Sequence, residues 1–200
     1  MTQPKPADMP MRLLTRDQLA AVAANTKSDF DGRCLQLPFF GTYNCLTTTA
    51  VYRPDGLRLP NKIKEILRSY VANYPAVPPP EGHLISYREL KGAGPLVVSF
   101  ANNTLKTISA TFTGKPSELE SAARTIGGRS RKDISGYDLY IEFMALPGIP
   151  LTLQFNDAQA LFPAQCSLLL DASIGTYLNM QSIFTLGTFL CGRLVASCYN

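Results

Sequence analysis

Apolar residues recur three and four positions apart in several stretches of the chain, the spacing of one face of an α-helix. The repeat is clearest at Ile63, Ile66 and Leu67. Thr15 suits the N-cap of an Ala-rich helix. Helices are therefore predicted at residues 16–25, 62–73, 96–113, 116–126 and 180–195.

Other stretches alternate between apolar and polar residues, or are rich in Thr, Val and Tyr, as β-strands are. Pro147 and Gly148 separate two of them and predict a hairpin, and Pro54, Asp55 and Gly56 predict a turn. Strands are predicted at residues 33–40, 42–53, 137–146, 150–155 and 165–170.

These elements predict one α+β domain over residues 15–200, preceded by a flexible arm at residues 1–14. Its sheet is expected to be mostly antiparallel with about five strands, and a long C-terminal helix packs on it. The Pro-rich residues 75–80 are the best candidate for a linker between two domains within the chain. The elements on either side are too few for two separate cores, so a single domain is favoured.

Composition narrows the class of protein. The chain has 200 residues, of which 46% are hydrophobic and 17% charged, a globular balance. The net charge of +4 is not gathered with aromatic residues into a basic stripe, so no nucleic-acid partner is expected. No apolar run reaches the roughly 18 residues of a membrane span, and residues 1–10 lack the apolar core of a signal peptide. A soluble, cytoplasmic protein is expected.

The five cysteines are widely spaced, and His83 is the only histidine. They form no CxxC motif and no Cys/His pair at zinc spacing. All five are expected to be reduced thiols, with no metal and no cofactor.

Two groups of residues could bind a ligand. Arg129 and Arg131 lie in the sequence GGRSRK at residues 127–132, where glycines and cations could hold an anion. Asp157 and Asp171 end predicted strands, where a carboxylate can act as a base. An exposed basic loop and turn capping explain the same residues without a ligand.

Tyr87 and Arg88 are the remaining candidates. Arg88 has apolar neighbours and precedes a Gly-Ala-Gly turn, so its guanidinium needs an acceptor. An ion pair of Arg88 with Asp157 or Asp171 is predicted, and a structural role is favoured for it over ligand binding. No complete catalytic set is present in the sequence.

Several motifs together resemble one family. They are LPFFGTY at residues 37–43, SYRELKGAGPL at 86–96, LPGIPL at 146–151, DAQALFPA at 157–164 and LDAS at 170–173. This order resembles an uncharacterised domain family of anaerobic bacteria and archaea, some members of which are fused to an iron–sulfur cluster segment. The resemblance implies a context of anaerobic redox or one-carbon metabolism and carries no catalytic residues.

The function expected from the sequence is a non-catalytic binding or accessory domain whose partner is an iron–sulfur or other redox protein. One alternative is an enzyme acting on a small anionic substrate, with Arg88, Arg129 or Arg131 binding it and Asp157 or Asp171 as base. Another is a structural dimerisation module. A pocket that holds Tyr87, Arg88 and Asp157 together would favour the enzyme.

Overall fold

A computed structural model describes residues 13–80 and 82–198. Most of the predicted arm, residues 1–12, therefore lies outside the described residues. Leu14 is buried, and its N–H donates to the carbonyl oxygen of Thr48 at 3.1 Å. Helix α1 (Arg16–Thr26) follows as predicted, and Thr15 and Gln18 close its first turn with a reciprocal pair of hydrogen bonds.

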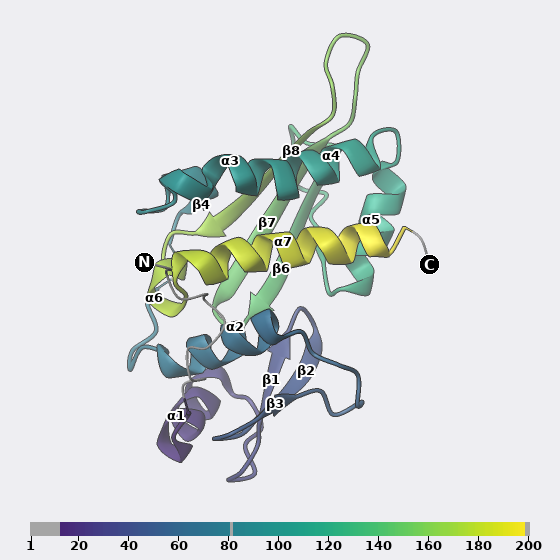
Figure 1. The fold of residues 1–200 in the computed structure, drawn as a ribbon. Helices are drawn as coiled ribbons and strands as arrows, with labels where there is room; N and C mark the ends of the chain where they lie inside the picture. Colours follow the sequence, from purple (N-terminus) through teal and green to yellow (C-terminus); the bar gives the residue numbers. More distant parts are fainter. Residues whose placement is uncertain (1–12, 81, 199–200) are drawn as a thin grey trace, which may run out of the picture.

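The first part of the chain builds a three-stranded antiparallel sheet in the order β1-β2-β3. Its strands are β1 (Leu35–Phe39), β2 (Thr42–Leu46) and β3 (Val51–Tyr52). The prediction of one strand over residues 42–53 was wrong. The side chain of Thr47 accepts the N–H groups of Thr49 and Ala50, and this turn breaks the strand in two. Helices α1 and α2 (Asn61–Ala72) lie beside this sheet (Figure 1).

The second sheet has five antiparallel strands in the order β4-β8-β7-β6-β5. They are β4 (Leu84–Ser86), β8 (Gln165–Asp171), β7 (Ile149–Asn156), β6 (Leu139–Leu146) and β5 (Arg129–Ser130). The predicted hairpin at Pro147 and Gly148 is confirmed by the β6–β7 pairing. The α+β class and the antiparallel pairing are confirmed too, although the strands form two sheets instead of one.

Helices cover one face of the five-stranded sheet (Figure 1). Short 3₁₀ turns, η1 (Tyr87–Glu89) and η2 (Gly94–Leu96), lead into α3 (Val97–Phe100), a π-helical segment η3 (Ala101–Leu105) and α4 (Lys106–Phe112). Helix α5 (Pro116–Thr125) and the short α6 (Ile174–Tyr177) precede the long C-terminal α7 (Met180–Ala196), which crosses the sheet. No helix in the described part of the chain combines the length and apolar character of a membrane crossing.

One core joins both sheets. The N–H of Phe40, after β1, donates to the carbonyl oxygen of Ala145 in β6 at 3.0 Å. Side chains on the helix-covered face of the larger sheet, such as Ile141, Leu153 and Leu168, are buried in the same cluster as Leu35 and Leu37 of β1. A single domain with a long C-terminal helix follows from this packing.

The prediction of five reduced cysteines was wrong for one pair. Cys34 and Cys45 form a disulfide, with their Cα atoms 5.6 Å apart. Cys45 lies opposite Gln36 in the β1–β2 hairpin, so the pairing of these strands brings it beside Cys34. Cys166, Cys191 and Cys198 are free thiols. Sequence spacing alone did not reveal the pair because the hairpin register creates it.

Candidate functional site

The face of the five-stranded sheet opposite the helices carries two neighbouring rows of side chains. Strand pairing places Arg129, Glu142, Thr152, Leu169 and Ser86 in one row that runs straight across the sheet. The adjacent row holds Met144, Pro150, Asp171 and Leu84, because each lies two positions along its strand from a member of the first row. Met144 is 55% exposed and Leu84 41%, so solvent reaches this face.

A cavity of about 760 Å³ opens over these rows. Ligand pockets for small molecules usually measure a few hundred to about 1,000 Å³. The strand residues that line the cavity are Leu84, Arg129, Tyr140, Glu142, Phe143, Met144, Leu146, Pro150, Thr152 and Asp171, together with Pro38 of β1 and the backbone at Gly41, Gly82 and Gly127. The cavity therefore lies where the two sheets meet.

Asp171 is the buried acidic group of the cavity, with 4% of its surface exposed. One carboxylate oxygen accepts the N–H of Ser173 at 2.8 Å, and the other accepts the N–H of Gly82 at 2.7 Å. Burial raises the pKa of Asp171, but the hydrogen bonds from Ser173 and Gly82 outweigh it, so the pKa lies below its ordinary value. Asp171 is consequently an anion at neutral pH. It caps the start of the next turn, as predicted, and also faces the cavity.

The basic end of the cavity is formed by β5. Arg129 lies directly opposite Glu142, yet Glu142 is paired with another cation, because Nη1 of Arg131 lies 3.2 Å from its Oε1. Arg131 also binds Asp133 at 2.7 Å. Arg129 forms no ion pair with any residue that the structure describes. Of the two predicted arginines, Arg129 lines the cavity and is left to bind an anion, and Arg131 is engaged by carboxylates.

The other three predicted residues lie elsewhere. The ring of Tyr87 stacks on Phe100 with centroids 4.0 Å apart, on the helix-covered side of the sheet. Asp157 accepts the N–H groups of Gly114 and Ala158 at the base of the β7–β8 connection. Arg88 is exposed. The predicted ion pair of Arg88 with Asp157 or Asp171 is absent from the described residues, because Arg88 lies exposed on the turn η1 and its side chain is not buried against either carboxylate.

Comparison with protein families assigns this chain to a family. A family model described as a domain of unknown function, DUF3786, matches residues 18–193. The chain belongs to the DUF3786 family. No curated protein and no solved structure matches it.

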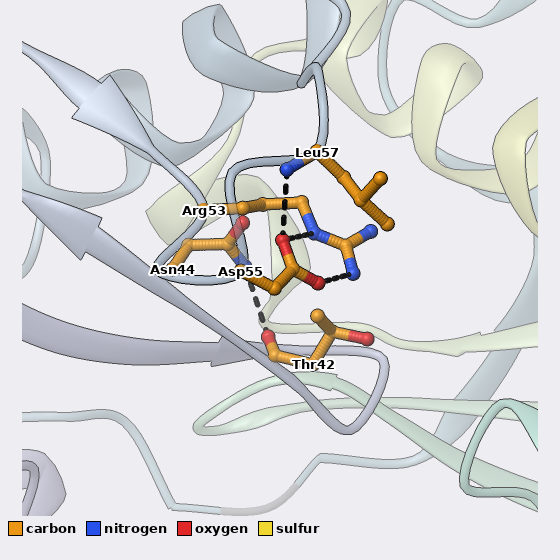
Figure 2. A network of polar contacts seen from close by, with 5 residues as sticks. All are labelled: Thr42, Asn44, Arg53, Asp55 and Leu57. Atoms are coloured by element: carbon orange, nitrogen blue, oxygen red, sulfur yellow. Dashed lines mark hydrogen bonds and ion pairs between the residues drawn. The ribbon is translucent and has the colours of Figure 1, made fainter.

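A second polar cluster of the DUF3786 domain lies beside the smaller sheet (Figure 2). The guanidinium of Arg53 binds both oxygens of Asp55, and the N–H of Leu57 donates to the same carboxylate at 3.1 Å. Asn44 is buried, and its Nδ2 donates to the carbonyl oxygen of Thr42. These contacts close the turn predicted at residues 54–56 and leave the guanidinium of Arg53 engaged, so we assign the cluster a structural role.

The free cysteines are poor candidates for chemistry. Burial raises the pKa of Cys166 to about 12 and that of Cys191 to about 11, so both are neutral thiols near pH 7. Within residues 13–80 and 82–198, no cluster of three or more His, Cys, Asp and Glu side chains could hold a metal ion.

Sequence reasoning found two residues of the cavity, Arg129 and Asp171, and missed the others. Glu142, Met144 and Thr152 were assigned to strands but not to a site. The signal was present in the alternation of residues 139–146, where the positions facing away from the core are Tyr140, Glu142 and Met144. A polar or flexible residue at each outward position indicates a face that is not packed by helices.

Proposed function

We propose that this chain is a non-catalytic binding domain that holds a small ligand in the cavity on the open face of the five-stranded sheet. The observation that carries the proposal is the pair of charges in that cavity. Among the described residues, Asp171 is a buried carboxylate that forms no ion pair, with His83 as a nearby group whose charge acts on it, and Arg129 is an arginine that forms none either. Both groups gain from a ligand that supplies the missing charge.

The enzyme alternative has less support. A pocket holding Tyr87, Arg88 and Asp157 together would have favoured it, and these residues lie under the helices, on the surface and at the base of a loop, respectively. A base within hydrogen-bond reach of a substrate held by Arg129 would have to be Glu142 or Asp171. The first is engaged in an ion pair with Arg131. Two N–H groups hold the second as an anion with a lowered pKa, which makes Asp171 a weak base.

The binding proposal is tested by an NMR screen of a small-molecule library against the isotope-labelled protein. Compounds that bind are expected to shift the amide resonances of Arg129, Thr152 and Asp171. Met144→Trp fills the cavity mouth and should abolish these shifts. Val98→Trp is the matched control, because Val98 is exposed on α3, on the helix side of the sheet, and it should retain them. Equal binding by both variants, or no shifted cavity resonance with any compound, would refute the proposal.

A second candidate is a dimerisation module, favoured by one exposed segment. The connection between β7 and β8 projects from the domain (Figure 1), and Leu161 and Phe162 on it are 87% and 64% exposed. Sedimentation equilibrium should then show a dimer that the Leu161→Ser and Phe162→Ser double variant dissociates. A monomer at all concentrations would remove this candidate.

We propose the redox partner from the family resemblance and the cytoplasmic location from the sequence composition. An iron–sulfur or other redox protein from anaerobic metabolism is the partner we propose. In a reducing compartment the Cys34–Cys45 disulfide would be transient, since cytosolic disulfides usually are. The thiols are trapped with an alkylating agent at the moment of cell lysis, and the labels on the denatured protein are counted by mass. Five labels are therefore expected, against three for a stable disulfide. Three thiols would contradict the proposed location.

A further inference from the structure

We propose that the ligand of this cavity is a short peptide with free ends, whose terminal ammonium binds Asp171 and whose terminal carboxylate binds Arg129. The inference rests on the proposed function, because it names the class of ligand for the same cavity. It is drawn from three features of the open face: an acceptor at one end, a donor at the other, and an uncharged stretch between them.

The acceptor end is built for a cation. A carboxylate has about four acceptor positions on its two oxygens. The N–H groups of Gly82 and Ser173 occupy two of them at Asp171, and the side chain of Ser173 binds the same carboxylate. The positions that are left are open to a ligand. A buried carboxylate is stable only when it is paired with a cation or fully hydrogen-bonded. A primary ammonium, with three donors, meets that requirement better than a neutral group does.

The donor end suits a carboxylate. The guanidinium of Arg129 can bind both oxygens of a planar carboxylate at once. The only acidic side chain opposite Arg129 in the sheet is Glu142, and Arg131 compensates its charge at 3.2 Å. Arg131 is shared between Glu142 and Asp133, so this end of the cavity holds two arginines and two carboxylates. Arg129 is the arginine of the two that forms no ion pair with a described residue, and a ligand carboxylate would pair with it.

The separation of the two ends sets the length of the ligand. Arg129 and Asp171 are three strand positions apart, in the order β5-β6-β7-β8, and are offset by two residues along the strands. Strand spacings of about 4.8 Å and a rise of about 3.3 Å per residue give roughly 16 Å between their backbones. An extended chain advances about 3.3–3.6 Å per residue, so peptides of about three to five residues span this distance.

The stretch between the ends favours uncharged ligand side chains. Met144 and Pro150 lie side by side in the row that contains Asp171, and Thr152 lies in the adjacent row. The backbone groups of these strands are engaged in the ladder, so a peptide on the face cannot pair with them as an added strand would. Recognition then depends on the two charged ends, and the sequence of the peptide should matter little.

The test is calorimetric titration of the full chain with tetraalanine and its end-blocked forms. Acetylating the amine or amidating the carboxylate should each weaken binding about 10- to 100-fold, the range for losing a charge-assisted hydrogen-bonded contact. Free alanine, which carries both charges but cannot span the ends, should bind at least as weakly as the blocked peptides.

Variants assign each end to its residue. Arg129→Gln should weaken binding of tetraalanine and remove the effect of amidation, because the carboxylate no longer has a partner. Asp171→Asn should likewise remove the effect of acetylation. Arg88→Gln is the matched control, since it removes an exposed arginine outside the cavity and should leave both effects unchanged. If Asp171→Asn fails to fold, Arg129→Gln still tests the proposal, because Arg129 is exposed and its replacement should not disturb folding.

The outcomes separate this inference from the proposed function. If blocked and free tetraalanine bind equally, or if tetraalanine does not bind while compounds from the NMR screen occupy the cavity, the peptide inference is wrong and the binding domain stands. If neither tetraalanine nor any library compound shifts a cavity resonance, both are wrong.

Discussion

Gly187, in the middle of α7, shows how one missing side chain sets the packing of a helix. A Cβ built on Gly187 would lie 2.6 Å from Cζ of Phe100, which is far closer than van der Waals contact. Phe100 cannot easily move away, because its ring is buried and stacked on Tyr87. Glycine at this position is therefore required by the close approach of α7 to the segment around Phe100.

The effect of Gly187→Ala should oppose the usual helix propensity. We expect the free energy of unfolding to fall by about 1–3 kcal/mol, the range for overpacking a core. Gly192→Ala in the same helix is the control, since nothing lies within 4 Å of its Cβ position, and it should raise stability by up to about 1 kcal/mol. Urea unfolding measures both, and a stabilising Gly187→Ala would contradict the packing described.

Asp171 should make stability depend on pH in the acid range. Its pKa is lower in the folded chain than in the unfolded one, so its contribution is complete above the unfolded value of about 3.9 and is lost as pH falls below it. Asp171→Asn should lower the free energy of unfolding by about 1–3 kcal/mol at pH 7. It should also flatten the decline below about pH 4. If the free energy of unfolding falls equally below pH 4 in the unsubstituted protein and in Asp171→Asn, the charged carboxylate is not stabilised by folding.

At the scale of elements, the π-helical segment Ala101–Leu105 interrupts the helix that leads from α3 to α4. Such segments are rare and strain the regular hydrogen-bond pattern. Thr104 lies in it, fully buried, and its hydroxyl has no hydrogen-bond partner among the described residues. The segment thus contains a polar group that folding removes from water without compensation.

Replacing that hydroxyl by a methyl group should stabilise the protein. Thr104→Val keeps the shape of the side chain and removes the unpaired group, so the free energy of unfolding should rise by about 1–3 kcal/mol. Thr107→Val is the control, because Oγ1 of Thr107 donates to the carbonyl oxygen of Asn102 at 3.0 Å on the surface. Thermal unfolding should show no gain for the control. A loss of stability in Thr104→Val would mean that the hydroxyl is satisfied.

Long elements were predictable from the sequence, and short ones were not. The β6–β7 hairpin and α7 were predictable because their periods are long and their turn residues are specific. Strands β4 and β5, with three and two residues, carry no period to detect. Arg129 and Asp171 were candidates singly, but their shared cavity depends on the strand order β8-β7-β6-β5. Strand order is set by packing between distant segments, and local patterns do not contain it.

At the scale of the molecule, few polar contacts join the smaller sheet and its helices to the larger sheet. The hydroxyl of Tyr70 in α2 donates to the carbonyl oxygen of Pro147, in the β6–β7 turn, at 2.7 Å. The Tyr70 ring also stacks on Tyr177, with centroids 5.9 Å apart. The hydrogen bond connects segments that are far apart in sequence, and Tyr70 itself is fully buried.

Tyr70→Phe should weaken that connection without changing the ring packing. We expect a loss of about 0.5–1.5 kcal/mol in the free energy of unfolding, with a single transition preserved. Tyr74→Phe is the control, because its ring packs against the same cluster and its hydroxyl makes no hydrogen bond within the described part of the chain. Separate transitions for circular dichroism and tyrosine fluorescence in Tyr70→Phe would indicate that the two halves unfold independently.

The alternation of the five-stranded sheet has a consequence for how such a protein can evolve. Ile141 and Leu153 are buried in the core, and Glu142, Met144 and Thr152, close to them in sequence, face the cavity. Mutations can therefore replace the residues that face the cavity while the residues of the core stay the same. Descendants of one ancestor can diverge in what they bind and keep the same backbone, so neither fold nor overall identity would reveal that their ligands differ.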